Sequence, residues 1–278
     1  MALRIPSALL YDGHAIPLVG LGTYPLKGDA ARDAVRGAIE IGYRLIDTAA
    51  AYGNEDGVGA GIRESGVPRE ELRVVTKLRG RDQGRGTTRA GLEASLERLG
   101  LDHVDGFLIH WPNPSVDRYV ETYAEMTELR DEGLVTSVGV SNFKASQLQR
   151  VHDEVGEWPT MNQIQLSPLL ARTELRAFDA AHGIVTVAWG PLGRREGLPG
   201  NPVVAEVAAE LGTDEGRTVL RWAVQRGVVV IPKSGDPTRQ RVNADLFGFE
   251  LSEDQLARLD ALDLGEARAW DSDTHEEQ

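Results

Sequence analysis

The chain of 278 residues contains no cysteine. This absence excludes disulfides, thiolate catalysis, iron–sulfur clusters and most structural zinc sites. Positive charge is also scarce, since 30 Lys and Arg stand against 43 Asp and Glu for a net charge of −13, which argues against nucleic acid or an anionic membrane as the main partner. No stretch approaches the ~20 uncharged apolar residues that a membrane span needs, and the first residues lack the apolar core of a secretory signal. We therefore expect a cytoplasmic protein without nucleic-acid or membrane partners.

Short β-branched runs alternate with longer segments of helical period along the chain. Strands are predicted at 44–47, 74–77, 104–109, 135–140, 161–165, 184–188 and 228–231, with a weaker one at 19–23. Helices are predicted at 30–41, 54–64, 88–99, 117–132, 145–155, 174–182, 202–211, 214–226, 238–246 and 252–262. Strict alternation indicates parallel strands with crossover helices, and eight such units in about 250 residues fit a closed (β/α)₈ (TIM) barrel. An open doubly wound sheet is the alternative.

The two ends of the chain differ from this alternating middle. Asp12 and Gly13 between apolar runs predict an N-terminal hairpin, so that residues 1–18 precede a barrel over 19–247. A C-terminal helix and an acidic tail are expected over 248–278, where Trp270 either folds over a site or remains loosely packed. No linker, repeat or low-complexity tract divides the chain, so a single domain over 1–278 is predicted.

Polar or aromatic residues end one predicted strand after another. In a barrel these strand ends converge on one mouth, where this fold places its chemistry. Each residue alone has a structural explanation, such as a turn cap, a satisfied core histidine or a bond to backbone. The coincidence of so many favours a functional site. The residues are Asp47, Lys77, His110, Ser141, Asn142, Gln163, Trp189 and Lys233.

Asp47, Tyr52, Lys77 and His110 together are suited to delivering a proton. A tyrosine with a pKa near ~10 is a poor acid at neutral pH, but an ammonium about 4 Å away could lower that pKa by up to ~3 units before desolvation opposes it. Asp47 would keep Lys77 charged, and His110 could orient a substrate oxygen. The set lacks a nucleophile, so it points to reduction of a carbonyl with hydride from a cofactor.

Several common sites are missing. The glycines at 57–61 have the wrong spacing for a dinucleotide-binding turn and lie inside a predicted helix. The stretch 139–143 lacks the last glycine of a hydrolase elbow, and six scattered histidines show no metal-ligand spacing, so no metal is expected.

The remaining polar residues suit a nicotinamide nucleotide. Ser141, Asn142 and Gln163 can bond a carboxamide, and Trp189 offers a flat face for the ring. The loop 189–193 can bring backbone N–H groups to a pyrophosphate. A basic cluster that could hold an anion follows the last strand, although a solvated helix face is the alternative. Its members are Lys233, Ser234, Arg239 and Arg241.

Motifs along almost the whole chain, from Ile16 to Asp263, carry a family resemblance. They are GLGTY at 20–24, YRLIDTAAAYGNE at 43–55, TKL at 76–78, LIHWPNP at 108–114, GVSNF at 139–143, NQIQ at 162–165, WGPLG at 189–193 and IPKS at 231–234. With them the chain resembles the aldo-keto reductase superfamily, and most of all its bacterial 2,5-diketo-D-gluconate reductase branch. The resemblance implies a (β/α)₈ barrel that binds NADPH in extended form, with NADH as the lesser alternative.

The resemblance also implies individual roles. Tyr52 would be the general acid, Lys77 and Asp47 its tuners, and His110 the group that orients the carbonyl. Around the nicotinamide, Ser141, Asn142 and Gln163 would bind the carboxamide and Trp189 would stack on the ring. Leu192 and Gly193 would contact the pyrophosphate. The 2′-phosphate would be bound by Lys233, Ser234 and Arg239, and the adenine would be contacted by Asn243. Gly22, Thr23, Asp47 and Gly190 complete the predicted cofactor set.

Some positions depart from the family pattern. Val242 precedes Asn243 where relatives often have glutamate, and Asp236 stands where they tend to have a basic or neutral residue, which could weaken phosphate binding. Arg79 replaces a tryptophan that often follows TKL.

Substrate contacts are predicted for the residues around the mouth. Tyr24, Arg79, His110 and Trp111 form this set, with Trp270 as a further candidate for the apolar wall. Arg194 and Arg195 could recruit an anionic substrate or simply face solvent.

The predicted activity is NADPH-dependent reduction of small aldehydes, α-keto or dicarbonyl compounds, including keto-sugar acids, by a monomer. A catalytically idle NADP(H)-binding sensor on the same fold is the main alternative. An isomerase that forms a Schiff base through Lys77 is a third alternative. Asp47 would keep this lysine charged, and a charged lysine is a poor nucleophile.

Overall fold

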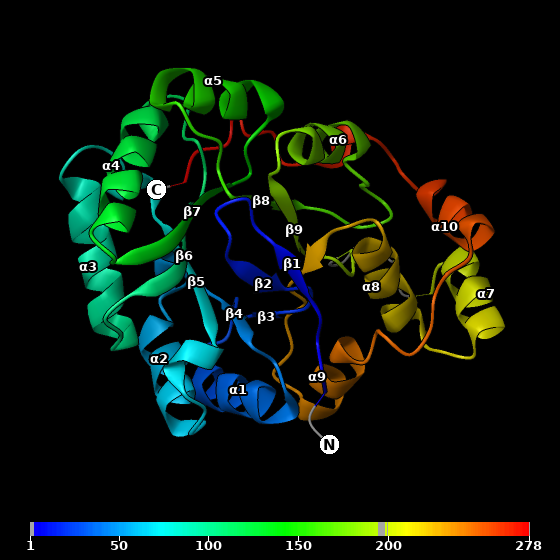
Figure 1. Ribbon diagram of the computed structural model, residues 1–278. Coiled ribbons are helices and arrows are strands. Elements are labelled where there is room, and N and C mark those ends of the chain that lie inside the picture. The colour runs from blue at the N-terminus through cyan, green and yellow to red at the C-terminus, as the bar shows by residue number, and fades with distance from the viewer. Residues whose placement is uncertain (1–2, 194–197, 199, 278) are drawn as a thin grey trace.

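The computed structural model describes residues 3–193, 198 and 200–277. Eight parallel strands curl into a barrel and helices surround it (Figure 1). The strands are β3 Leu21–Gly22, β4 Leu45–Asp47, β5 Arg73–Leu78, β6 Val104–Ile109, β7 Val135–Ser141, β8 Met161–Gln165, β9 Val185–Trp189 and β10 Val229–Val230. They pair in the order β3 to β10. Backbone bonds from Val230 N to Leu18 O and from Gly20 N to Val230 O, both 2.9 Å, close the barrel.

The helices follow the strands as the alternation predicts. They are α1 Gly28–Ile41, α2 Glu55–Glu64, α3 Thr87–Leu99, α4 Tyr119–Asp131, α5 Ala145–Val155, α6 Thr173–Ala181, α7 Pro202–Leu211, α8 Glu215–Gln225, α9 Pro237–Ala244 and α10 Glu253–Asp260. Side-chain caps define several starts: Asn201 accepts from Val203 N at α7, and Ser252 forms a capping box at α10. The (β/α)₈ barrel with extra C-terminal helices is confirmed, whereas the boundaries proposed within the single domain stay a prediction. No helix in the described part of the chain is long and apolar enough to cross a bilayer.

The N-terminal hairpin closes one end of the barrel. Strands β1 Ser7–Leu9 and β2 Ala15–Pro17 pair antiparallel, and Figure 1 shows them across the centre of the ring of helices. Leu10 and Ile16 of the hairpin join a buried cluster with the residues that fill the barrel, among them Leu108 and Val187. The catalytic chemistry of a barrel belongs at the opposite end, where the C-terminal ends of the strands form the mouth.

The glycine run 57–61 has a packing role in α2. A Cβ on Gly59 would lie 1.9 Å from Leu99 O at the end of α3, and one on Gly57 would lie 2.6 Å from Gly28 O in α1. These glycines let three helices approach closely, and they lie in a helix as predicted rather than in a phosphate-binding turn.

Asp179 on α6 predicts a pH dependence of stability. Its side chain is fully buried, and its Oδ2 accepts from Thr186 Oγ1 at 2.8 Å. Burial raises the pKa of Asp179 to about 7, against opposing hydrogen bonds from Thr186 and Asn162. A carboxyl whose pKa is higher in the folded than in the unfolded state contributes stability at low pH that is lost as the pH rises through the folded pKa.

Asp179→Asn removes this ionisation. We expect its stability relative to the parent protein to be higher near pH 8 than near pH 5 by about 2–3 kcal/mol, as the raised pKa implies. Urea unfolding at both pH values measures the difference. An equal effect of the substitution at the two pH values would show that Asp179 does not titrate in this range.

Candidate active site

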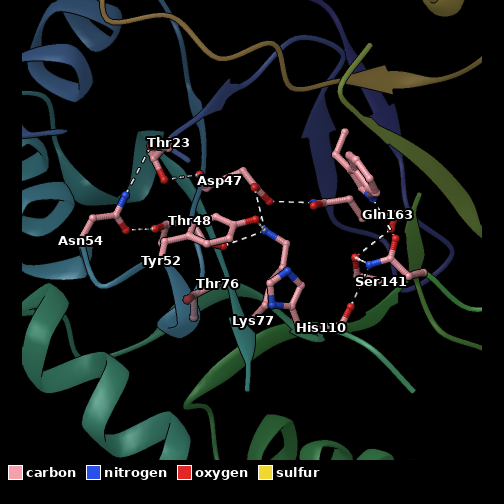
Figure 2. Close-up of polar contacts among 12 residues, drawn as sticks. Thr23, Asp47, Thr48, Tyr52, Asn54, Thr76, Lys77, His110, Ser141 and Gln163 are labelled. Carbon is pink, nitrogen blue, oxygen red and sulfur yellow. Dashed lines mark hydrogen bonds and ion pairs between the residues drawn. The ribbon is translucent and has the colours of Figure 1, made fainter. Parts of the chain in front are cut away.

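Asp47, Tyr52, Lys77 and His110 lie together at the mouth (Figure 2). Asp47 ends β4, Lys77 lies near the end of β5, and His110 directly follows β6. Tyr52 comes from the short 3₁₀ turn η1 Ala50–Tyr52, which follows β4. The convergence predicted from the strand ends is thus present in the structure.

Lys77 is the centre of this group. Its side chain has no exposed surface, and its Nζ donates to Asp47 Oδ1 and to the Thr48 carbonyl, both at 2.7 Å. The Tyr52 hydroxyl lies 3.5 Å from the same Nζ. Burial opposes the ammonium, but Asp47 and Tyr52 outweigh it and raise the pKa of Lys77. Lys77 therefore stays charged at neutral pH.

The pKa of Tyr52 corrects one expectation. From the sequence we expected Lys77 to lower it strongly, whereas in the structure it lies above the usual value. Burial of the phenol is the largest cause, and Asp47 and Glu277 add to it, while Lys77 lowers the pKa. Desolvation of the phenolate thus exceeds its attraction to the nearby ammonium. Tyr52 keeps its proton at neutral pH, which suits a proton donor.

The groups expected to hold a carboxamide are connected to the same cluster. Gln163 Nε2 donates to Asp47 Oδ2 at 2.7 Å, and Ser141 Oγ donates to the Gln163 carbonyl at 2.8 Å. Asn142 Nδ2 donates to Ser141 Oγ and to the His110 carbonyl, both at 3.0 Å, and the Trp189 indole N–H donates to Asn142 Oδ1 at 2.8 Å. Hydrogen bonds therefore run from the buried lysine to the tryptophan, so polar amide groups and a flat ring lie side by side as a nicotinamide requires.

His110 lies between Tyr52 and the C-terminal tail. The His110 and Tyr52 rings meet edge to face with centroids 5.6 Å apart, and Tyr24, which is 55% exposed, also packs against Tyr52 at 5.1 Å. A carbonyl oxygen between Tyr52 and His110 would have two polar groups within reach.

The predicted pyrophosphate and phosphate contacts come from two loops. Gly190 and Gly193 have positive φ angles of 63° and 72°, and Gly193 N bonds to Gly190 O at 3.0 Å, which forms a tight turn after β9. Lys233 and Arg239 are exposed, as solvent-facing phosphate contacts require. Asp236 caps α9 by accepting from Thr238 N at 2.8 Å and Arg239 N at 3.1 Å, so its carboxylate occupies the helix N-terminus next to these cations.

Other predicted cofactor residues have structural contacts. A Cβ on Gly22 would lie 2.7 Å from Ile231 O, so glycine is needed where the first and last strands meet. Thr23 is buried and donates through Oγ1 to the Asp47 carbonyl at 3.0 Å. Ser234 Oγ accepts from Asp236 N at 3.0 Å, and Asn243 is buried in α9. These contacts fix the walls of the site, and direct roles in nucleotide binding stay predictions.

The predicted substrate residues differ in accessibility. Arg79 donates to the Ala50 carbonyl and so ties down the turn that carries Tyr52. Trp111 is buried because the tail covers it: Trp270 stacks on it with centroids 6.0 Å apart, and His275 lies at 4.0 Å. Trp270 therefore folds over the site, the first of the two alternatives. Arg194 and Arg195 lie outside the described residues.

Two residues that hold the site together, Asn54 and Glu277, were not among the predicted site residues. Asn54 links the segments that follow β3 and β4, because its Oδ1 accepts from Thr48 Oγ1 at 2.9 Å and its Nδ2 donates to the Leu26 carbonyl at 2.9 Å. Glu277 Oε1 lies 2.6 Å from His110 Nδ1. Asn54 lies within the motif at 43–55, which could have pointed to it. Nothing in the acidic tail distinguishes Glu277 from the neighbouring carboxylates. Among the described residues no group of three or more His, Asp or Glu could hold a metal ion.

Across most of its length the chain is similar to known proteins. Residues 18–264 match the aldo/keto reductase family. The chain belongs to this family. It is 47% identical over 274 residues to 2,5-diketo-D-gluconic acid reductase B of Corynebacterium sp. (strain SHS752001), covering 99% of both chains. It is 42% identical over 265 residues to a methylglyoxal reductase of Escherichia coli (strain K12), covering 95% of this chain and 96% of the relative.

A solved aldo/keto reductase also supports the cofactor class. The crystal structure of a Bombyx mori aldo-keto reductase in complex with NADP superposes with a TM-score of 0.89 at 37% identity, covering 94% of each chain. The chain is thus an oxidoreductase on an aldo/keto reductase barrel, and its linked amide groups, tryptophan ring and exposed cations fit a nicotinamide nucleotide. The resemblance read from the sequence motifs is confirmed.

Proposed function

We propose that this aldo/keto reductase uses NADPH to reduce small aldehydes and dicarbonyl compounds to alcohols, with Tyr52 as the general acid. The observation that carries the proposal is the position of the protonated Tyr52 hydroxyl, 3.5 Å from a fully buried ammonium and beside His110. The names of the two relatives, a diketo-acid reductase and a methylglyoxal reductase, support the dicarbonyl class.

The chain's own groups divide the chemistry among them. The bound nucleotide supplies hydride to the carbonyl carbon. Tyr52 and His110 hold the carbonyl oxygen, and Tyr52 transfers its phenolic proton to that oxygen as negative charge develops there. Lys77 then lies 3.5 Å from the phenolate that remains and stabilises it, while the 2.7 Å bond from Lys77 to Asp47 keeps the ammonium charged.

An assay of NADPH consumption distinguishes a reductase from a catalytically idle NADP(H)-binding sensor. A reductase consumes NADPH when methylglyoxal or an aromatic aldehyde is added, and the loss of NADPH absorbance follows this directly. Binding of NADPH without consumption, across a panel of aldehydes and dicarbonyls, would favour the idle sensor. The intact four-residue cluster favours the enzyme, since a sensor has no need of a proton donor. The monomeric state stays a prediction that sedimentation measurements can test.

The position of Asp236 suggests a substitution that changes the preference between NADPH and NADH. Its carboxylate lies at the start of α9, among the cations proposed to bind the 2′-phosphate. Asp236→Asn keeps a good helix cap and removes one negative charge, so we expect the Kd of NADPH to fall about three- to tenfold. The Kd of NADH, which lacks the 2′-phosphate, should stay unchanged and serves as the internal control in a fluorescence titration. Equal changes for both nucleotides would place the phosphate elsewhere.

A further inference from the structure

The end of the C-terminal tail is clasped at the mouth by Asn113. Asn113 Nδ2 donates to the Glu277 carbonyl at 2.8 Å, and Glu277 N donates to Asn113 Oδ1 at 2.9 Å. The Glu277 side chain points inward: its Oε2 accepts from Gly80 N at 3.0 Å and its Oε1 lies 2.6 Å from His110 Nδ1. Only 12% of this side chain is exposed. The tail therefore delivers a carboxylate into the site.

The loop after β5 is shaped to receive this segment. A Cβ on Gly80 would lie 1.9 Å from Asn113 Nδ2 and 2.3 Å from the Glu277 carbonyl. Only glycine leaves room for the clasp at this position.

Contacts further back along the tail hold the same arrangement. Lys144 on the loop after β7 pairs with Asp271 and Asp273, both at 2.5 Å, and His275 packs on Trp111. The tail is thus attached to the mouth at three places: at Lys144, at Trp111 and at Asn113. Several contacts, rather than a single bond, therefore hold Glu277 in position.

We propose that Glu277 is a specificity-determining residue, whose carboxylate makes this site prefer neutral carbonyl compounds to α-keto carboxylates. The inference rests on the proposed reductase function, and it disfavours α-keto carboxylates within the proposed substrate class. It concerns only acids whose carboxylate is bonded to the reacting carbonyl carbon.

The reason is electrostatic. When the oxygen of an α-keto acid reaches His110 and Tyr52, its carboxylate lies near the ring that the Glu277 carboxylate contacts at 2.6 Å, and like charges in a partly buried site repel. With solvent screening, the penalty on binding and turnover is about tenfold.

Pyruvate and methyl pyruvate give a matched test, because they share the reacting ketone and differ by one charge. In Glu277→Gln, which keeps the size and an acceptor for Gly80 N, we expect the ratio of kcat/KM for pyruvate to kcat/KM for methyl pyruvate to rise about tenfold. Glu277→Asp, which keeps the charge, should retain the preference for methyl pyruvate.

Glu276→Gln is the control, because Glu276 carries the same charge next in the chain but bonds to Ser115 N on the surface at 2.9 Å. Its ratio for the two substrates should match that of the parent protein. An unchanged ratio in Glu277→Gln, or equal changes for both substrates, overturns the assignment, since equal changes indicate release of the tail rather than removal of a charge. If the parent protein consumes NADPH with neither substrate nor methylglyoxal, the proposed function itself is wrong and this inference falls with it.

Discussion

Tyr52→Phe is expected to lower kcat by about 10²- to 10⁴-fold, the range over which a positioned general acid contributes. The substitution removes the hydroxyl 3.5 Å from Lys77 and leaves the ring packed against Tyr24 and His110. Because the ring stays in place, we expect the Kd of NADPH to change by less than about threefold, as measured by fluorescence titration.

Tyr11→Phe is the control for this substitution. Tyr11 lies in the turn of the hairpin at the closed end of the barrel, where its hydroxyl donates to the Trp158 carbonyl, so its loss should leave kcat unchanged. Wild-type turnover in Tyr52→Phe would assign the proton donor to another group. A large rise in the Kd of NADPH would instead indicate that the site had rearranged.

Lys77→Met is expected to abolish turnover and to destabilise the protein by about 3–5 kcal/mol, the usual cost of breaking a buried ion pair. Lys77 has no exposed surface and pairs with Asp47, itself 2% exposed, so the substitution leaves an uncompensated buried carboxylate. Methionine approximates the length of the lysine stem and limits the loss of packing. Urea unfolding gives the change in the free energy of unfolding.

The double variant Asp47→Asn, Lys77→Met separates charge from packing. We expect it to regain much of the stability lost in Lys77→Met, because the buried carboxylate is gone, and to remain inactive. If the single substitution costs less than about 1 kcal/mol, solvent or another cation must compensate Asp47, and the pair is not the buried unit described here.

The convergence of Asp47, Lys77 and His110 could be predicted because barrel topology brings the C-terminal ends of neighbouring strands to one mouth. The hydrophobic pattern gave the helices to within a few residues, since the barrel strands are largely buried and most helices bury an apolar side. The weakly patterned segment 19–23 became only the two-residue strand β3, where Gly22 is needed because a side chain would meet Ile231.

Other features could not be predicted from the sequence. The direction of the shift in the pKa of Tyr52 depends on how far burial of the phenolate exceeds its attraction to Lys77, and a motif carries no measure of burial. Glu277 reaches His110 across 167 positions of sequence through a clasp made by Asn113, which a local pattern does not contain. Long-range contacts of an irregular tail are set by side-chain fit at the mouth, not by periodicity.

The hairpin that packs against the interior of the barrel has a consequence for kinetics. Leu10 and Ile16 close the other end with apolar side chains. The proposed nucleotide, carbonyl compound and alcohol would therefore enter and leave by a shared route at the mouth. Any molecule retained along that route delays the exchange of all the others. We therefore expect inhibition by accumulated product and ordered rather than random exchange, and steady-state experiments that vary product concentration would register both.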